Sequence, residues 1–401
     1  MPYAPQKPPG PAAMTALLLN IGHAIDHLLL LVFATAVGAI AADFGVDSWE
    51  SLMPYATGAF FMFGLGSLPS GRLGDLWGRR AMMLVFFFGI GLASIGVAFT
   101  TGPWSMAVAL TLVGCFASIY HPVGIPMLIQ STRTPGKTIG INGLAGNLGI
   151  AVAALSTGFL VQLAGWRAAF VVPGVISIVC GLLFLRATTA ETEPPAKRAP
   201  KLIDMPESVR RRVFAVMLMT AITGSLAFNL TTNGNAELLK DRLPTLATEP
   251  ATLGMLLALV YTIASLAQLL VGRLIDAVPM RPLMLAIMVL QPVAFFAATA
   301  SEGWMMFVAM TAFMLLVFGG IPFSDAIIAR YIDDRMRSRV SGIRLTISFT
   351  ASSSAVWLLG PFVKHSGFNA LLITLAVITA CSAAAALLLP HSAPPAQGAA
   401  T

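Results

Sequence analysis

Charged residues are scarce in this chain of 401 residues: Asp, Glu, Lys and Arg make up 10% of it, against about 25% in an ordinary soluble domain. Apolar residues make up 57%, and the mean hydropathy is +0.83. A folded interior hides only part of a chain, and these polar residues are too few to coat the rest. The composition excludes a soluble globular protein and a disordered one. It predicts a polytopic α-helical membrane protein.

Sequence features of enzymes and cofactor sites are also missing. The three cysteines lie in apolar runs without a Cys-x-x-Cys partner, so neither a disulfide framework nor a zinc site is supported. The pair Gly64 and Gly66 lacks the strand and the third glycine of a dinucleotide site, and no phosphate loop or ATP-binding domain is present. We therefore expect no enzymatic activity, no cofactor and no resident metal.

Apolar stretches of membrane-spanning length recur along the chain. They form two sets of six, so the predicted fold is all-α, with twelve spans in two bundles at 14–187 and 211–389. A polar linker at 188–210 separates the bundles, and short tails lie at 1–13 and 390–401, the second expected to be disordered. The expected spans are 14–42, 51–73, 81–100, 103–131, 138–164, 166–187, 211–238, 251–275, 281–299, 303–330, 339–363 and 367–389.

The basic residues indicate the orientation. If both termini are cytoplasmic, nineteen of the 24 Lys and Arg residues fall on the cytoplasmic side, four outside and Arg344 within a span. This asymmetry obeys the positive-inside rule. The net charge of +7 is therefore read as a topology signal, with anionic lipid and not nucleic acid as the partner.

The two halves resemble each other at an offset of about 201–202 residues. Gly71-Arg-Leu-Gly-Asp75 matches Gly272-Arg-Leu-Ile-Asp276, and Gly165-Trp166 matches Gly367-Phe368. Several matches at one offset indicate duplicated six-helix halves. A parallel repeat of this kind is a plan of secondary transporters, with the substrate site near the midplane between the halves.

The segment Gly71-Arg-Leu-Gly-Asp75-Leu-Trp-Gly78-Arg79-Arg80 resembles the cytoplasmic signature of the major facilitator superfamily. The resemblance implies that Asp75 helps to latch the halves in the outward-facing state, although the charges could also serve topology alone. Leu76 stands where the family usually has a base, and the second copy keeps only Gly272 and Asp276. Two further stretches, Gly22-His-Ala-Ile-Asp-His27 and Tyr120-His-Pro122, resemble the fosmidomycin-resistance-like drug exporters.

Polar groups inside the spans are the candidate site, because a charge at mid-membrane costs about 2.5–3.5 kcal/mol and usually faces a cavity. His23 shares a helix face with Asp26 and His27, and His121 is expected to face them. A carboxylate flanked by imidazoles could exchange protons near neutral pH. The alternatives are that the histidines only link helices, or that the four side chains bind a divalent metal.

The second half adds further candidates. Arg344 could anchor a carboxylate or phosphonate, or it could lie at the cytoplasmic mouth or pair with Asp325. Its counterpart in the repeat is Asn142, and the counterpart of His27 is Asn229. Glycines 143, 146 and 149 recur every three residues and predict a smooth face for close helix packing.

The sequence thus predicts a monomeric, multi-pass secondary transporter in a bacterial inner membrane. The expected activity is proton-coupled export of a small organic solute, drug-like or anionic, by alternating access. One alternative is transport of a divalent metal or a metal complex by the His/Asp cluster. Another is a sensor or assembly protein with a transporter fold.

Overall fold

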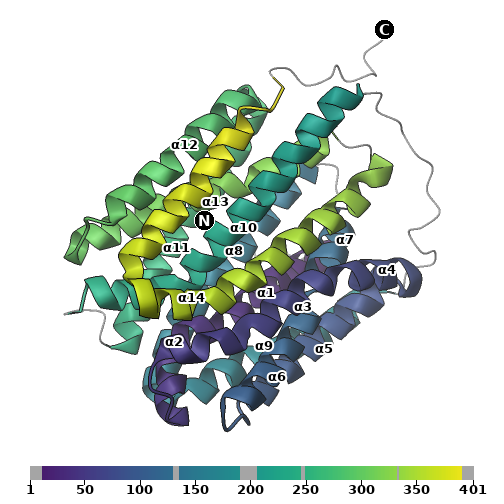
Figure 1. Cartoon of the computed structure of the whole chain (residues 1–401). Helices are drawn as coiled ribbons and strands as arrows, with labels where there is room; N and C mark the ends of the chain where they lie inside the picture. The colour runs from purple at the N-terminus through teal and green to yellow at the C-terminus, as the bar shows by residue number, and fades with distance from the viewer. Residues whose placement is uncertain (1–10, 130–134, 190–205, 245–248, 332–333, 391–401) are drawn as a thin grey trace, which may run out of the picture.

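The structure, a computed structural model, describes residues 11–129, 135–189, 206–244, 249–331 and 334–390. Within these ranges all regular structure is helical, and ten helices are long and apolar enough to cross a membrane. Figure 1 shows them in two bundles, one formed by the N-terminal half of the chain and one by the C-terminal half. The predicted all-α membrane fold is confirmed.

The first bundle begins with α1, a helix of 34 residues. Two of its other crossings are divided into shorter helices. Its elements are α1 (Pro11–Phe44), α2 (Trp49–Leu52), η1 (Met53–Ala56), α3 (Thr57–Leu65), α4 (Ser67–Trp77), α5 (Arg79–Val97), α6 (Pro103–Ala117), η2 (Tyr120–Gly124), α7 (Ile125–Ile129), α8 (Pro135–Ala164) and α9 (Trp166–Ala187).

The second bundle contains five helices of 19 to 53 residues among the described residues. They are α10 (Glu207–Arg242), α11 (Pro250–Ala277), α12 (Met280–Ala298), α13 (Gly303–Tyr331) and α14 (Asp334–Ala386). Helix α14 is two helices in one run, because Gly367 has a φ of 75° and interrupts it. Only glycine adopts this conformation readily.

The ten candidate spans are consistent with twelve crossings. The expected span 51–73 is divided among α2, η1, α3 and α4, none of which is long enough alone to qualify. The expected spans 339–363 and 367–389 are counted together in α14. The division of the chain into domains stays a prediction, and most of the linker and both tails lie outside the described residues.

The repeat inferred from the sequence recurs in the backbone. Gly165, between α8 and α9, has φ 83° and ψ 165°, and Gly367 has φ 75° and ψ 171°. Gly158 and Gly360 lie about two turns earlier, and each faces the other half. A Cβ at Gly158 would lie 2.4 Å from the Pro250 carbonyl oxygen, and one at Gly360 would lie 2.2 Å from the Glu50 carbonyl oxygen. Equivalent glycines therefore do equivalent packing work in the two bundles.

The bundles contact each other at one end of the molecule and also near its middle, where Phe63 meets Phe349. We call the end with Arg72, Arg79, Arg80, Arg273 and Arg281 the basic end, and the opposite end, with α2 and the kink of α14, the far end. At the far end Trp49 stacks on Phe368, with ring centroids 6.3 Å apart, and Lys364 contacts Ser51. Figure 1 shows the bundles joined near α2 and the kink of α14, and diverging toward α4 and α12.

Candidate functional site

Asp26 lies on α1 in the interior of the protein, with none of its surface exposed. Among the residues that the structure describes, neither carboxylate oxygen has a hydrogen-bond partner. His121 lies beside it, with its Nε2 3.7 Å from Oδ2 of Asp26. A buried carboxyl group is normally hydrogen-bonded, so this one is a candidate functional group and not a structural one.

A local break in the fourth crossing positions His121. The segment Tyr120–Gly124 forms a single π-helical turn between α6 and α7. Pro122 within this turn has no backbone N–H to donate, and π turns of this kind are frequent at functional sites. The turn brings His121 to α1, as expected from the sequence, with its ring 4.9 Å from that of His23.

The hydrogen bond from His23 to α8 fixes its tautomer. Its Nδ1 lies 2.8 Å from the backbone oxygen of Asn142, which can only accept, so Nδ1 carries the proton. In the neutral ring Nε2 is then an acceptor. His27 Nε2 lies 3.1 Å from that atom and donates to it. The two imidazoles thus form a directed chain of hydrogen bonds.

Asn142 and Tyr120 support this chain. The Asn142 carboxamide donates to Asn20 Oδ1 at 2.9 Å and to the Tyr120 hydroxyl at 2.8 Å, and that hydroxyl donates to the Leu19 carbonyl oxygen at 2.7 Å. The Tyr120 ring stacks on His23 at 4.7 Å. The sequence analysis named Tyr120 only as part of the motif Tyr120-His-Pro122, without this supporting role, and it missed Asn20.

The glycine stripe of α8 makes room for these side chains. A Cβ at Gly146 would lie 2.6 Å from the His23 ring, and one at Gly149 would lie 2.3 Å from the Ala24 carbonyl oxygen. The predicted packing role is confirmed for Gly146 and Gly149, through which α8 contacts α1, whereas a Cβ at Gly143 would lie 3.1 Å from Oε1 of Gln268 on α11.

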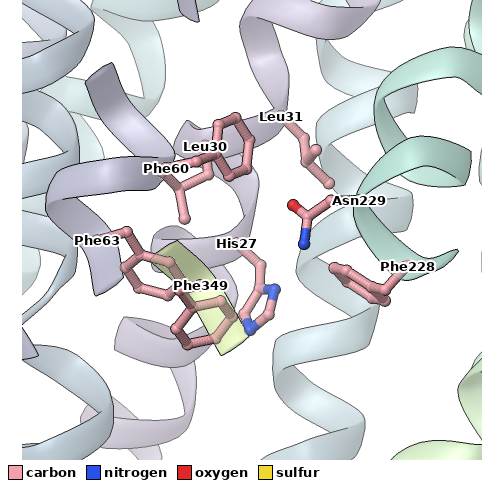
Figure 2. Close-up of a pocket in the computed structure, with 8 residues that line it drawn as sticks. All are labelled: His27, Leu30, Leu31, Phe60, Phe63, Phe228, Asn229 and Phe349. Carbon is pink, nitrogen blue, oxygen red and sulfur yellow. The ribbon is translucent and has the colours of Figure 1, made fainter. Parts of the chain in front are cut away.

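A small cavity of about 20 Å³ lies next to His27, between the two bundles. That volume is room for about one water molecule. Figure 2 shows His27 and Asn229 facing it among apolar side chains. The apolar lining consists of Leu30, Leu31, Phe60, Phe63, Phe228 and Phe349. Sequence reasoning placed His27 and Asn229 here but not the phenylalanines, which it could not tell from packing residues.

Among the candidates of the second half, Arg344 is half-buried on α14 and close enough to His121 for an electrostatic interaction. Two protonated groups would repel each other there. The side chains of Asp325, Asp75 and Asp276 lie outside the described residues, so their roles stay predictions.

The two arginines of the loop signature donate to backbone carbonyl oxygens of their own bundle, and Arg80 does so at the C-terminal end of a helix. Arg80 donates to the Leu185 and Thr188 carbonyl oxygens at the C-terminal end of α9, each at 3.0 Å. Arg79 donates to the Pro126 carbonyl oxygen in α7 at 3.3 Å. Cations at helix C-termini satisfy carbonyls that have no partner within the helix. Gly78, with a φ of 90°, makes the turn that precedes α5.

The glycines of the signature differ in their surroundings. A Cβ at Gly71 would be in ordinary contact with Pro122, at 3.4 Å, whereas one at Gly74 would lie 2.9 Å from Val123. Of these two glycines, Gly74 is therefore the one packed more tightly against η2. A Cβ at Gly272 would meet no atom within 4 Å among the described residues.

The histidine cluster also has a geometry that metals accept. One nitrogen from each of His23, His27 and His121 lies within 4.8 Å of the others. Three imidazoles beside a carboxylate are adequate donors for a divalent transition metal. The metal alternative drawn from the sequence therefore stays open on geometry.

Comparisons with known proteins identify the family. The family model described as Major Facilitator Superfamily matches residues 19–239 and 243–401. The chain belongs to this superfamily. Over 197 residues it is 28% identical to the tetracenomycin C resistance and export protein of Streptomyces glaucescens. This aligned stretch covers 48% of this chain and 35% of that protein. Also over 197 residues, it is 29% identical to the probable actinorhodin transporter of Streptomyces coelicolor. This second aligned stretch covers 47% of this chain and 34% of that protein.

The chain thus spans about a third of the length of these superfamily relatives. Among solved structures, a D-xylose–proton symporter matches with a TM-score of 0.76 at 14% identity, over 95% of this chain and 98% of that one. At this identity the likeness shows the fold alone. Membership of the superfamily also agrees with the expectation that the chain is not an enzyme.

Proposed function

We propose that this protein is a secondary active transporter of a bacterial inner membrane that exports a small organic solute in exchange for protons. The relatives named for export of tetracenomycin C and for actinorhodin transport support the solute class and the direction. The basic end is taken as cytoplasmic under the positive-inside rule, with both termini on that side. The halves, joined at the far end and diverging toward the basic end, then correspond to an inward-facing state.

The observation that carries the proposal is the environment of Asp26. Its carboxyl is wholly buried, has no hydrogen-bond partner among the described residues, and lies 3.7 Å from an imidazole nitrogen of His121. Removing an ion from water is costly unless it is paired, so proton binding at Asp26 changes the free energy of this site strongly. Such a group is suited to couple a proton to a movement of the surrounding helices.

The chemistry required of the site is one proton transfer in each direction. A proton arriving from the outside is held by the Asp26 carboxyl or by Nε2 of His121, and it leaves toward the cytoplasm once the halves have rocked. The solute occupies the cavity between the halves when they rock back in the opposite direction. Alternating access of this kind moves the two bundles around a fixed midplane site.

The proposal predicts that Asp26→Asn abolishes uphill transport while exchange persists. The purified protein, in proteoliposomes with an imposed pH gradient, is offered tetracenomycin C and actinorhodin as probes. Asp26→Asn keeps the size of the side chain but cannot take up a proton, so concentration of the probe against its gradient is lost. Counterflow exchange of the same probe needs no net proton transfer and remains.

The matched control is Asp43→Asn, the same substitution on the same helix. Asp43 is half-exposed and bonds to Arg167 at 2.8 Å near the far end. This variant should concentrate the probe as the unmodified protein does. The proposal fails if Asp26→Asn still concentrates the probe. Uphill movement of Zn²⁺ or Co²⁺ without an organic probe would favour the metal alternative, and no movement of any solute would favour the sensor.

A further inference from the structure

The cavity beside His27 is formed by both halves of the molecule. Leu30, Phe60 and Phe63 come from α1 and α3, and Phe228 and Phe349 come from α10 and α14. Phe63 and Phe349 meet across the boundary between the halves with ring centroids 4.3 Å apart. Movement of the halves must therefore change the size of this cavity. Aromatic side chains on several sides favour a flat, apolar guest that can stack or meet ring edges.

The two polar groups of the lining both present acceptors. The NH₂ of Asn229 donates one of its two hydrogens to the Ser225 carbonyl oxygen at 3.0 Å, and its own oxygen is an acceptor. His27 donates its Nε2 proton to His23, because His23 holds its own proton on Nδ1 against the Asn142 carbonyl oxygen. In the neutral state Nδ1 of His27 is then an acceptor too. Figure 2 shows the His27 ring and the Asn229 carboxamide on the same side of the cavity.

Among the described residues, those that line the cavity include no carboxylate, ammonium or guanidinium group. A charged guest would lose its hydration without gaining an ion pair. A neutral guest with a hydroxyl donor would satisfy an acceptor of the protein, whereas a guest without a donor would leave it unpaired. These preferences define one chemical class.

We propose that this cavity is the solute site and that it takes a neutral, flat aromatic molecule carrying a hydroxyl group, that is, a phenol. The inference rests on the proposed function, because it assigns the substrate class of that same transporter. The hydroxyl donates to the carboxamide oxygen of Asn229, and the ring lies among Phe60, Phe63, Phe228 and Phe349. The volume of about 20 Å³ belongs to a contracted state, and entry of the ring requires the halves to separate.

The test compares three probes of the same ring size on the unmodified protein. They are 2-naphthol, 2-methoxynaphthalene, which lacks the donor, and 2-naphthoate, which is an anion. Binding is measured by equilibrium dialysis in detergent near neutral pH, with a protein-free detergent chamber to subtract partitioning into micelles. We expect 2-naphthol to bind at least about tenfold more tightly than either of the other two.

Two variants connect the preference to the cavity. Asn229→Leu removes an acceptor at similar volume and should reduce the preference for 2-naphthol over its methyl ether to about twofold. Phe228→Ala should weaken the binding of all three probes by a similar factor, about tenfold, because ring contacts are lost. Phe296→Ala on α12, where the side chain is 64% exposed to the lipid side, is the matched control and should change nothing.

The proposal is overturned if 2-methoxynaphthalene or 2-naphthoate binds as tightly as 2-naphthol, a result that needs no variant and no folding control. It is also overturned if the preference survives in Asn229→Leu while Phe228→Ala has no effect. These measurements involve no proton gradient. Failure of coupling in Asp26→Asn proteoliposomes and failure of phenol binding are therefore separate results.

Discussion

His23 is held in place by three neighbours from two other segments. Its ring stacks on Tyr120, donates to the backbone of Asn142 and fills the space left by Gly146. Inside a membrane protein such a network fixes which nitrogen carries the proton. We infer that Tyr120 and Asn142 are positioning residues, which act on proton transfer through the orientation of His23.

The network predicts a measurable cost for removing one hydroxyl. Tyr120→Phe deprives the buried Asn142 carboxamide of one acceptor, which should lower the free energy of unfolding by about 1–2 kcal/mol. Thermal unfolding of the purified protein in detergent measures this change. Tyr55→Phe is the control, because the half-buried Tyr55 ring packs against Trp104. Equal stability of Tyr120→Phe and Tyr55→Phe would contradict a structural role for the hydroxyl.

At the residue scale, the sequence predicted which polar groups gather but not how they bond. Asp26, His23 and His27 share a helix face by spacing alone, and His121 follows from the fold implied by the resemblance. The tautomer of His23 depends on a backbone oxygen 119 residues away, at Asn142. Likewise the four phenylalanines of the cavity could not be chosen from 24 in the chain.

At the scale of elements, the crossing of α8 and α11 depends on small residues. A Cβ at Gly158 would lie 2.4 Å from the Pro250 carbonyl oxygen, and one at Gly254 would lie 2.5 Å from that of Ala154. Close packing of helices in lipid requires such small side chains. Because these two helices belong to different halves, their contact closes the far end of the molecule.

This geometry predicts that Gly158→Val holds the far end open. The added side chain cannot fit against α11, so the outward-facing state gains population. Spin labels at Phe99→Cys and Trp304→Cys, exposed sites of the two halves near the far end, report the separation by double electron–electron resonance. The native cysteines are first replaced by serine.

The expected result is a distance distribution shifted to longer values in Gly158→Val. Gly96→Val is the control, since a Cβ there meets no atom within 4 Å among the described residues. An unchanged distribution in Gly158→Val would mean that this crossing does not close the far end.

Element boundaries were predicted where the physics is local. The expected spans agree with helices because length and hydropathy decide them, as in 166–187 and α9 (Trp166–Ala187). The break into α3 and α4 at Gly66 and the π turn at Tyr120–Gly124 were not predicted. The first lies at a tertiary contact, since a Cβ at Gly66 would lie 2.5 Å from the Ser118 hydroxyl of the neighbouring crossing.

At the scale of the whole molecule, the two halves share a scaffold and differ in chemistry. The offset of about 201–202 residues relates Gly165 to Gly367, which adopt the same backbone conformation. The same offset, taken as 202 residues, relates His27 to Asn229. These two residues line one cavity from opposite halves. Asp26 corresponds to Phe228. We therefore propose that the first half binds the proton, while both halves contribute to the solute site.

The coupling assigned to Asp26 is tested most directly by proton movement itself. Proteoliposomes that contain a pH-sensitive dye and no imposed gradient are given a solute that the protein transports, and the internal pH is followed. The account predicts a solute-dependent pH change with the unmodified protein and with Asp43→Asn, and none with Asp26→Asn. A full pH change with Asp26→Asn would contradict it.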